Sequence, residues 1–395
     1  MSLKTSFCNK SILKSDLKRF WWVGLLEAII IFLTNTLPLW YRVSDLEGVV
    51  RQSGYDVGRI ITWQNGQFLI PCIFAVSVVA LLFSYMHQVA SVSFYHSIPV
   101  TRKTLFTTKI VSALVITVLP ILLNALVIFG VVSTSNATLD YKYLAVFKWI
   151  YTGFIYTILM ISLSSFVNMM TGNPIGTVIF TTGFVFLPFV VVTFYQFFCS
   201  TEVYGFYWDS AYECMEWIYI TEKNLMDFGH LAVYLVLTAV FFALGYLLYK
   251  KRKLEMYGEV IAFSGLKPVF IGIISLIFSM AGYAYFGELF GGNNIFYLIP
   301  LGLLGTIIAW MVSRKSISPK GIFKPICTYT LVTLAIIGIV KFDLSGFERR
   351  IPDADDVEWV DIMDVYNSQY DYMWIRGEKI EFTIKGALDT KIYDE

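Results

Sequence analysis

The side chains best suited to acid–base, nucleophilic or metal chemistry are few and scattered along this sequence. Its three histidines, His87, His96 and His230, lie far apart, and none has a second metal ligand at a usual spacing. The five cysteines occur singly, without a Cys-x-x-Cys pair, and no Gly-x-Ser-x-Gly nucleophile motif is present. We therefore expect neither a metal site nor a hydrolytic centre in this chain.

A phosphate-binding loop of the form Gly-x-x-x-x-Gly-Lys-Ser/Thr is also absent from the sequence. In P-loop proteins this loop supplies the backbone N–H groups and the lysine that hold the phosphates of ATP. We therefore expect this chain to bind no nucleotide cofactor in that manner and to contribute no catalytic residue to ATP hydrolysis.

The composition is that of a chain embedded in a membrane. Hydrophobic residues make up 57% of it and charged residues only 15%, whereas soluble domains carry about 25% charged residues. The net charge is +1 and no basic cluster is interleaved with aromatic residues, so nucleic acid is excluded as a partner.

Nine apolar stretches have, or approach, the length of about 20 residues that a helix needs to cross a bilayer. They are 21–40, 66–86, 105–132, 144–169, 175–198, 230–249, 268–287, 295–313 and 325–341. The last two are the shortest, and each could instead form one arm of a re-entrant hairpin.

The distribution of lysine and arginine orients these spans. With the N-terminus in the cytoplasm, the cytoplasmic segments hold 17 Lys and Arg residues and the external loops between spans hold six. Cytoplasmic loops are enriched in these cations. The sequence thus predicts a cytoplasmic N-terminus and, after nine spans, an extracytoplasmic C-terminus.

Glu27 is nearly the only acidic residue inside a predicted span, and we interpret it as an interfacial acid near the cytoplasmic end of the first span. An ion-coupled carrier would need paired charges within its spans. Pro120 and Pro188 offer helix breaks at mid-span, but the charges are missing, which disfavours that class.

The N-terminal segment 1–20 has the pattern of an amphipathic helix lying on the membrane surface. Leu13, Leu17 and Phe20 fall on one helical face, and lysines project beside it. The alternative interpretation is a disordered basic leader.

The cytoplasmic loop 85–104 is longer than a connection between two spans needs to be. It contains the aromatic residues Phe94 and Tyr95, and Thr101 stands where it could cap the following helix. A short helix with apolar contacts and basic neighbours is suited to docking into a groove of another protein. An ordinary positively charged loop remains the alternative.

The external loop 199–229 combines six acidic residues with many aromatic ones, which is typical of the bilayer interface. It predicts a short re-entrant or surface helix pair, with a plain interfacial loop as the alternative. Cys199 and Cys214 both lie in this loop, where a disulfide between them is one option.

The character of the chain changes at about residue 342. The segment 342–395 is acidic and rich in turn residues, and Tyr372–Ile384 partly alternates between apolar and polar residues, which suggests edge strands. About fifty residues are too few for an independent core. We expect a small mixed or β-containing segment that packs on the membrane domain or begins a larger external domain.

Three blocks of sequence resemble the permease subunits of bacterial ABC transporters of the ABC-2 type. The blocks are Phe94-Tyr-His-Ser-Ile-Pro-Val-Thr-Arg-Lys-Thr-Leu-Phe106, Lys250-Lys-Arg-Lys-Leu-Glu-Met-Tyr-Gly-Glu-Val-Ile-Ala-Phe263 and Phe347-Glu-Arg-Arg-Ile-Pro-Asp-Ala-Asp-Asp356. The first is similar to the His-Ser-[Leu/Ile]-Pro-[Val/Ile]-[Ser/Thr]-Arg block of a Gram-positive permease group that carries an external C-terminal domain.

The resemblance implies an all-α polytopic membrane protein with a six-span ABC-2 core, like that of type V exporters, and the nine apolar stretches then leave about three further spans. The implied divisions are an elbow helix 1–20, a core 21–249, a cytoplasmic basic linker 250–267, three additional spans in 268–341 and an extracytoplasmic segment 342–395. The core would include a coupling loop 85–104 and an external hairpin 199–229. The residues implied to contact the ATPase are His96, Ser97, Ile98, Pro99, Thr101, Arg102 and Lys103.

The function that follows from the resemblance is that of a permease in the bacterial plasma membrane. Two copies of a cytoplasmic ABC ATPase, which bind ATP and Mg²⁺, would drive it together with a second permease chain, identical or paralogous. The expected substrate is hydrophobic or amphipathic: a peptide, an antibiotic, or a cell-envelope lipid or glycan. An external lipoprotein or ligand is a further expected partner. The alternative is a membrane sensor or assembly protein whose external tail binds a ligand without transport.

Overall fold

The computed structural model describes residues 8–41, 67–134, 142–203, 228–252, 259–292, 294–318, 320–344 and 346. Within these ranges every regular element is a helix, which confirms the all-α class. Eight of the helices are long and apolar enough to cross a membrane. The chain is therefore a multi-pass α-helical membrane protein. Most of the predicted C-terminal segment and of the predicted external hairpin lies outside the described residues.

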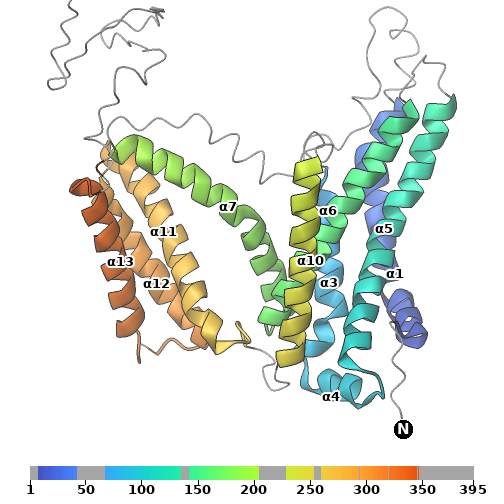
Figure 1. Ribbon diagram of the computed structural model, residues 1–395, viewed down its shortest axis with the longest axis horizontal. Coiled ribbons are helices and arrows are strands. Elements are labelled where there is room, and N and C mark those ends of the chain that lie inside the picture. The colour runs from blue at the N-terminus through green and yellow to red at the C-terminus, as the bar shows by residue number, and fades with distance from the viewer. Residues whose placement is uncertain are drawn as a thin grey trace, which may run out of the picture.

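The longer helices form two bundles joined by one bent helix (Figure 1). The first bundle contains α1 (Lys10–Ile31), α3 (Leu69–Leu82), α5 (Arg102–Thr134), α6 (Lys142–Met170) and α10 (Phe228–Lys251). The second contains α11 (Lys267–Phe290), α12 (Leu298–Arg314) and α13 (Phe323–Lys341). Between them runs α7 (Pro174–Glu202), which contacts α3 and α6 at its start and the second bundle at its end.

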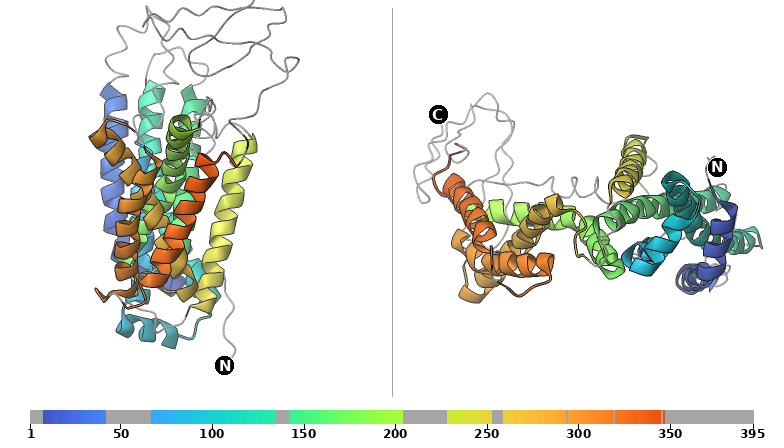
Figure 2. Two further views of the ribbon diagram at one scale, coloured as in Figure 1. Left: turned by 90° about the vertical axis from the view of Figure 1, so that its left-hand side faces the viewer. Right: turned by 90° about the horizontal axis from the view of Figure 1, so that it is seen from below.

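With the short helix α3 included, successive long helices alternate in direction, so the start of α1, the end of α10 and the turn between α12 and α13 share one end of the molecule (Figures 1 and 2). Lys250 and Lys251 close α10 at this end, and Arg314 closes α12. We call it the basic end. The last turn of α13 lies at the opposite end (Figure 1).

The second predicted span is shorter than expected. Its helix, α3, has 14 residues, whereas a membrane crossing takes about 20. The helix ends at Leu82, and after Phe83 the chain forms the 3₁₀-helix η3 (Ser84–His87), in which Met86 donates its backbone N–H to the Phe83 carbonyl at 3.0 Å. The prediction of one helix across 66–86 is therefore wrong for this stretch.

The N-terminal amphipathic segment is continuous with the first span. Helix α1 runs without a break from Lys10 to Ile31 and continues into a π-helical turn, Phe32–Thr36. Its first turns run across the basic end, and the remainder runs along α5 (Figure 2). No helix end separates the predicted elbow segment from the first span at residue 20, because Phe20 is buried in the core of the bundle and the helix continues through it.

Helices α1 and α5 pack closely because a glycine faces a free carbonyl. Pro120 interrupts the hydrogen-bond ladder of α5, since proline has no backbone N–H to give to the Ile116 carbonyl. A Cβ on Gly24 of α1 would lie 2.7 Å from that Ile116 oxygen. Only a residue without a side chain fits this crossing.

Candidate functional site

A short helix crosses the basic end of the first bundle. It is α4 (Val89–Ser97), and it lies nearly perpendicular to the spans (Figures 1 and 2). Thr101 ends the connection to α5, and its side-chain oxygen accepts the backbone N–H of Thr104 at 3.1 Å. This confirms that Thr101 caps α5. The loop 85–104 thus contains the kind of short helix that its sequence predicted.

The inner side of α4 is anchored by two packed tyrosine rings that lie beside a lysine. The ring of Tyr95 packs against the ring of Tyr85 with centroids 4.4 Å apart. The Nζ atom of Lys109, on α5, lies 4.8 Å from the Tyr95 centroid and 5.3 Å from the Tyr85 centroid. These are cation–π distances, so α4 is attached to α5 through both aromatic rings.

The same lysine is paired with an acid from α1. Lys109 Nζ lies 2.7 Å from Asp16 Oδ1, and the two side chains are only 2% and 4% exposed. Ser112 donates its hydroxyl to Asp16 Oδ2 at 3.1 Å. The buried pair therefore joins α1, α5 and, through the rings, α4. Lys109 is one of the 17 cations assigned to cytoplasmic segments from the sequence, and the structure shows that it is buried in this pair.

The predicted amphipathic face of α1 points into the protein. Phe20 is buried and Leu17 packs against the same core, while Leu13 is half-buried. Asp16 lies on this face, between positions 13 and 20, and its importance was missed at the sequence level. The sequence did contain a signal for it, because an acidic residue on the apolar face of a helix indicates a buried partner.

The outer side of α4 is exposed. Ala90, Phe94 and Ser97 recur at helical spacing on it, and Phe94 is 65% exposed. Beyond the helix, Pro99 and Lys103 are exposed and Ile98 is half-buried. Among the predicted ATPase contacts, the structure describes the backbone of His96 but not its side chain. An exposed aromatic ring beside a half-buried aliphatic residue is the composition of an interface centre.

Arg102 has a contact within the chain. Its Nη1 atom donates to the Lys250 carbonyl at 3.1 Å and lies 3.5 Å from the Tyr249 carbonyl. These carbonyls belong to the last turn of α10, where cations are stabilising. Arg102 therefore fastens the start of α5 to the end of α10.

Arg252, which falls in the predicted cytoplasmic basic linker 250–267, is buried. Its Nη1 atom donates to the carbonyls of Asn168 at 2.9 Å and Met169 at 3.2 Å, at the end of α6. Burial lowers the pKa of Arg252 to about 10, so it stays charged at neutral pH. The carbonyls that end α6 need donors, and Arg252 supplies them.

Burial, and secondarily the charge of Arg252, lowers the pKa of His87 to about 4. The Asn168 side chain and the Gly172 backbone act in the opposite direction, but neither ring nitrogen makes a full hydrogen bond. His87 is therefore neutral at pH 7. It lies in the chain between α3 and α4, and if it were protonated its charge would be repelled by that of Arg252.

Acidification is expected to destabilise this end of the bundle through His87. The unfolded chain binds a proton near the ordinary pKa of 6.5 and the folded chain only near about 4. The stabilising contribution is therefore complete above pH 6.5 and is lost as the pH falls towards 4. Thermal unfolding of the purified protein at pH 7.5 and pH 5 measures it. The variant His87→Gln should show a smaller drop, and an unchanged drop would contradict this role.

Glu27 is not the interfacial acid that the sequence predicted. Its side chain is fully buried between helices, and neither carboxylate oxygen has a hydrogen-bond partner among the described residues. The helical face of α1 explains its burial, because Phe20, Val23, Glu27 and Ile31 share the side that packs on the bundle. Ionisable groups at such positions are rare in membrane proteins and usually functional.

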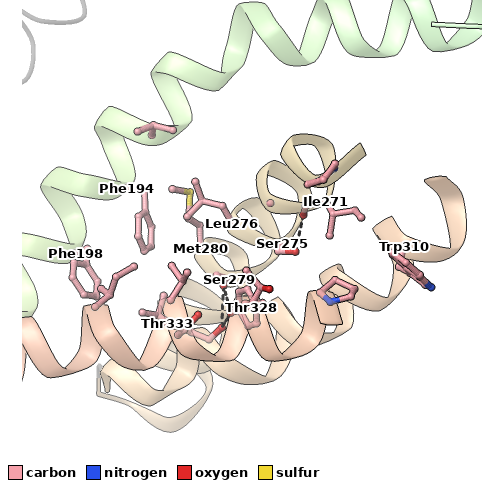
Figure 3. Close-up of a pocket in the computed structure, with 18 of the residues that line it drawn as sticks. Phe194, Phe198, Ile271, Ser275, Leu276, Ser279, Met280, Trp310, Thr328 and Thr333 are labelled. Atoms are coloured by element: carbon pink, nitrogen blue, oxygen red, sulfur yellow. Dashed lines mark hydrogen bonds between the residues drawn. The ribbon is translucent and has the colours of Figure 1, made fainter. Parts of the chain in front are cut away.

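A second candidate site is a cavity of about 1090 Å³ between α7 and the second bundle. Figure 3 shows Phe194 and Phe198 of α7 facing Ile271, Ser275 and Ser279 of α11, with α13 along the other side. Cys199, which also lines the cavity, is a free thiol. We call this cavity the α7 groove.

The helices and sites described here define a polytopic helical membrane protein, with a surface helix at its basic end and a groove between α7 and the second bundle. Comparisons with protein-family models, curated protein sequences and solved structures find no match. Within the described residues, no group of three metal-ligating side chains is present.

Proposed function

We propose that this chain is the permease subunit of an ATP-driven ABC transporter of the ABC-2 type. The observation that carries the proposal is α4, a surface helix with an exposed aromatic outer side and an inner side fixed to the spans. A docking surface of this kind suits a separate protein that must move the spans. The basic end would then face the cytoplasm, as the excess of lysine and arginine favours.

In this proposal the chain transmits force and performs no chemistry of its own. A cytoplasmic ATPase, holding ATP and Mg²⁺, would press on Phe94 and Ile98. The displacement would pass through Tyr95 to Lys109 and Asp16, and hence to α5 and α1, because these groups are in direct contact. Two ATPase copies and a second permease chain would complete the transporter in a bacterial plasma membrane.

The N-terminus of the permease would be cytoplasmic and its C-terminus extracytoplasmic. The substrate class that suits aromatic, apolar spans is a hydrophobic or amphipathic peptide, antibiotic or cell-envelope component. Exposed apolar side chains are abundant along α5 and α7, and these surfaces contact lipid, a second permease chain or the substrate.

The variant Phe94→Asp tests the docking role of α4. Truncating a central interface residue costs about 2 kcal/mol or more, so we expect Phe94→Asp to lose its ATPase during affinity purification. Phe94 is 65% exposed, so the folded chain tolerates the carboxylate. Arg102 is left intact, because replacing it would also release α10.

Phe323→Asp is the matched control. Phe323 begins α13 at the same basic end, is 77% exposed and lies away from α4. This variant should retain the ATPase as the unmodified chain does. Normal recovery of the ATPase with Phe94→Asp would show that α4 is not the docking site.

A further inference from the structure

The α7 groove runs along most of the height of the second bundle. Its lining extends on α13 from Lys324 to Val340, a length of about 24 Å at 1.5 Å per residue. The hydrocarbon core of a bilayer is about 30 Å thick. The groove therefore lies along the direction of lipid acyl chains and covers most of their depth.

Four hydroxyl groups that line the middle of the α7 groove are already hydrogen-bonded within the protein. Ser275 donates to the Ile271 carbonyl at 2.7 Å, and Thr328 donates to the Lys324 carbonyl at 3.0 Å. Tyr329 donates to the Leu298 carbonyl at 2.7 Å and is also bonded to Ser279. These groups offer little to a polar ligand, so the middle of the groove presents an effectively apolar wall.

Positive charge gathers where the α7 groove meets the basic end. Lys267, Arg314 and Lys324 line it there, and none of its lining residues is acidic. Lys267 is 3.4 Å from Glu259, an exposed pair that contributes little. Arg314 donates to the Lys320 carbonyl at 3.0 Å and lies over the Trp310 ring, which leaves most of its N–H groups available.

The opposite end of the α7 groove has a different polarity. Glu202 stands beside it, accepting a hydrogen bond from Tyr283 at 2.9 Å and pairing with Lys341 at 3.2 Å. Phe198 and Val203 line the groove next to this acid. An anionic group is therefore favoured at the basic end only.

We propose that the α7 groove binds an anionic membrane lipid from the leaflet at the basic end. The lipid phosphate lies among Lys267, Arg314 and Lys324, and an acyl chain follows α13 past Ser279 towards Phe198. Basic pockets between helices at this depth suit lipid phosphates. The inference goes beyond the proposed transport function and does not depend on an ATPase.

Native mass spectrometry of the purified full-length chain tests the headgroup. The probes are dioleoyl phosphatidylglycerol and dioleoyl phosphatidylcholine, which share acyl chains and differ in net charge. Three cations near a membrane surface predict a preference of more than about tenfold for the anionic lipid. Combining Lys267→Gln, Arg314→Gln and Lys324→Gln should abolish the preference. Lys315→Gln with Lys320→Gln, at the same end but outside the groove lining, should leave it unchanged.

A glycine in the groove wall tests the position of the acyl chain. A Cβ on Gly272 would meet nothing within 4 Å, so Gly272→Phe fills the groove without disturbing the helices. It should reduce binding of both lipids. Gly338 on α13 also has open space around it but is not in the lining, so Gly338→Phe should bind lipid normally.

Four results would overturn the assignment. Equal binding of the two lipids to the unmodified chain excludes recognition of an anionic headgroup. Unchanged preference in the triple variant places the lipid elsewhere. Displacement of the lipid by inorganic phosphate indicates a soluble anion. If Gly272→Phe separates a dimer and leaves lipid binding intact, the groove receives a second copy of the chain.

Discussion

Replacing Asp16 by leucine, or Lys109 by methionine, is expected to destabilise the protein by about 3 to 5 kcal/mol, because each change leaves the partner's charge buried and unpaired. Both side chains are almost fully buried, and their charged atoms are 2.7 Å apart. The double variant removes both charges and substitutes apolar groups of similar size. We expect the double variant to be close to the unmodified protein in stability. The attraction between two buried charges seldom exceeds the free energy that it costs to remove them from water.

Thermal unfolding of the four proteins in detergent micelles gives the coupling free energy between Asp16 and Lys109 as a double-mutant cycle. Leu69→Ala on α3, whose side chain is 40% exposed, is a control for loss of apolar area without loss of charge. Single variants as stable as the unmodified chain would mean that the pair is hydrated or unformed.

Introducing a side chain at Gly24 is the second change with a large expected effect. In Gly24→Val the new Cβ would lie 2.7 Å from the Ile116 carbonyl oxygen, which is backbone and cannot rotate away. Helices α1 and α5 must then separate, and overpacking of this kind costs about 1 to 3 kcal/mol, occasionally more. A lower unfolding temperature in detergent is the expected result.

Gly130→Ala in α5 is the matched control for the glycine substitution. No atom lies within 4 Å of a Cβ at Gly130, so only helix propensity changes. Alanine is favoured over glycine in a helix interior by about 1 kcal/mol. The control should therefore raise the unfolding temperature slightly. If Gly24→Val behaves in the same way, the two helices do not pack as closely as described.

The spans could be predicted because their signal is contained in single stretches of sequence. An apolar run such as 268–287 must become a helix in lipid, since every backbone N–H and C=O group needs an internal partner there. The short helix α4 could also be predicted, because the loop 85–104 is longer than a connection between two spans needs to be. It also contains aromatic residues and a threonine that caps the next helix. Each of these inferences uses neighbours along the chain.

The pairings between distant residues could not be predicted in this way. Nothing local to Lys109 distinguishes a solvated cytoplasmic cation from one paired with Asp16, 93 positions away. Arg252 belongs to a basic run of sequence, yet it hydrogen-bonds to carbonyls at the end of α6. The interfacial interpretation of Glu27 failed for the same reason, because its burial depends on which helices pack against α1.

The bent helix α7 connects the two bundles mechanically, like a lever. Pro188 divides the helix: Val185 packs against the core of the first bundle, whereas Val191 and the residues after it line the α7 groove. From Pro188 to Glu202 the arm is about 21 Å long. Each 10° of rotation at the proline would therefore carry its tip about 4 Å. Tilting the first bundle would therefore widen or narrow the α7 groove. An amphiphile bound there would be held more tightly or released as the tilt changes.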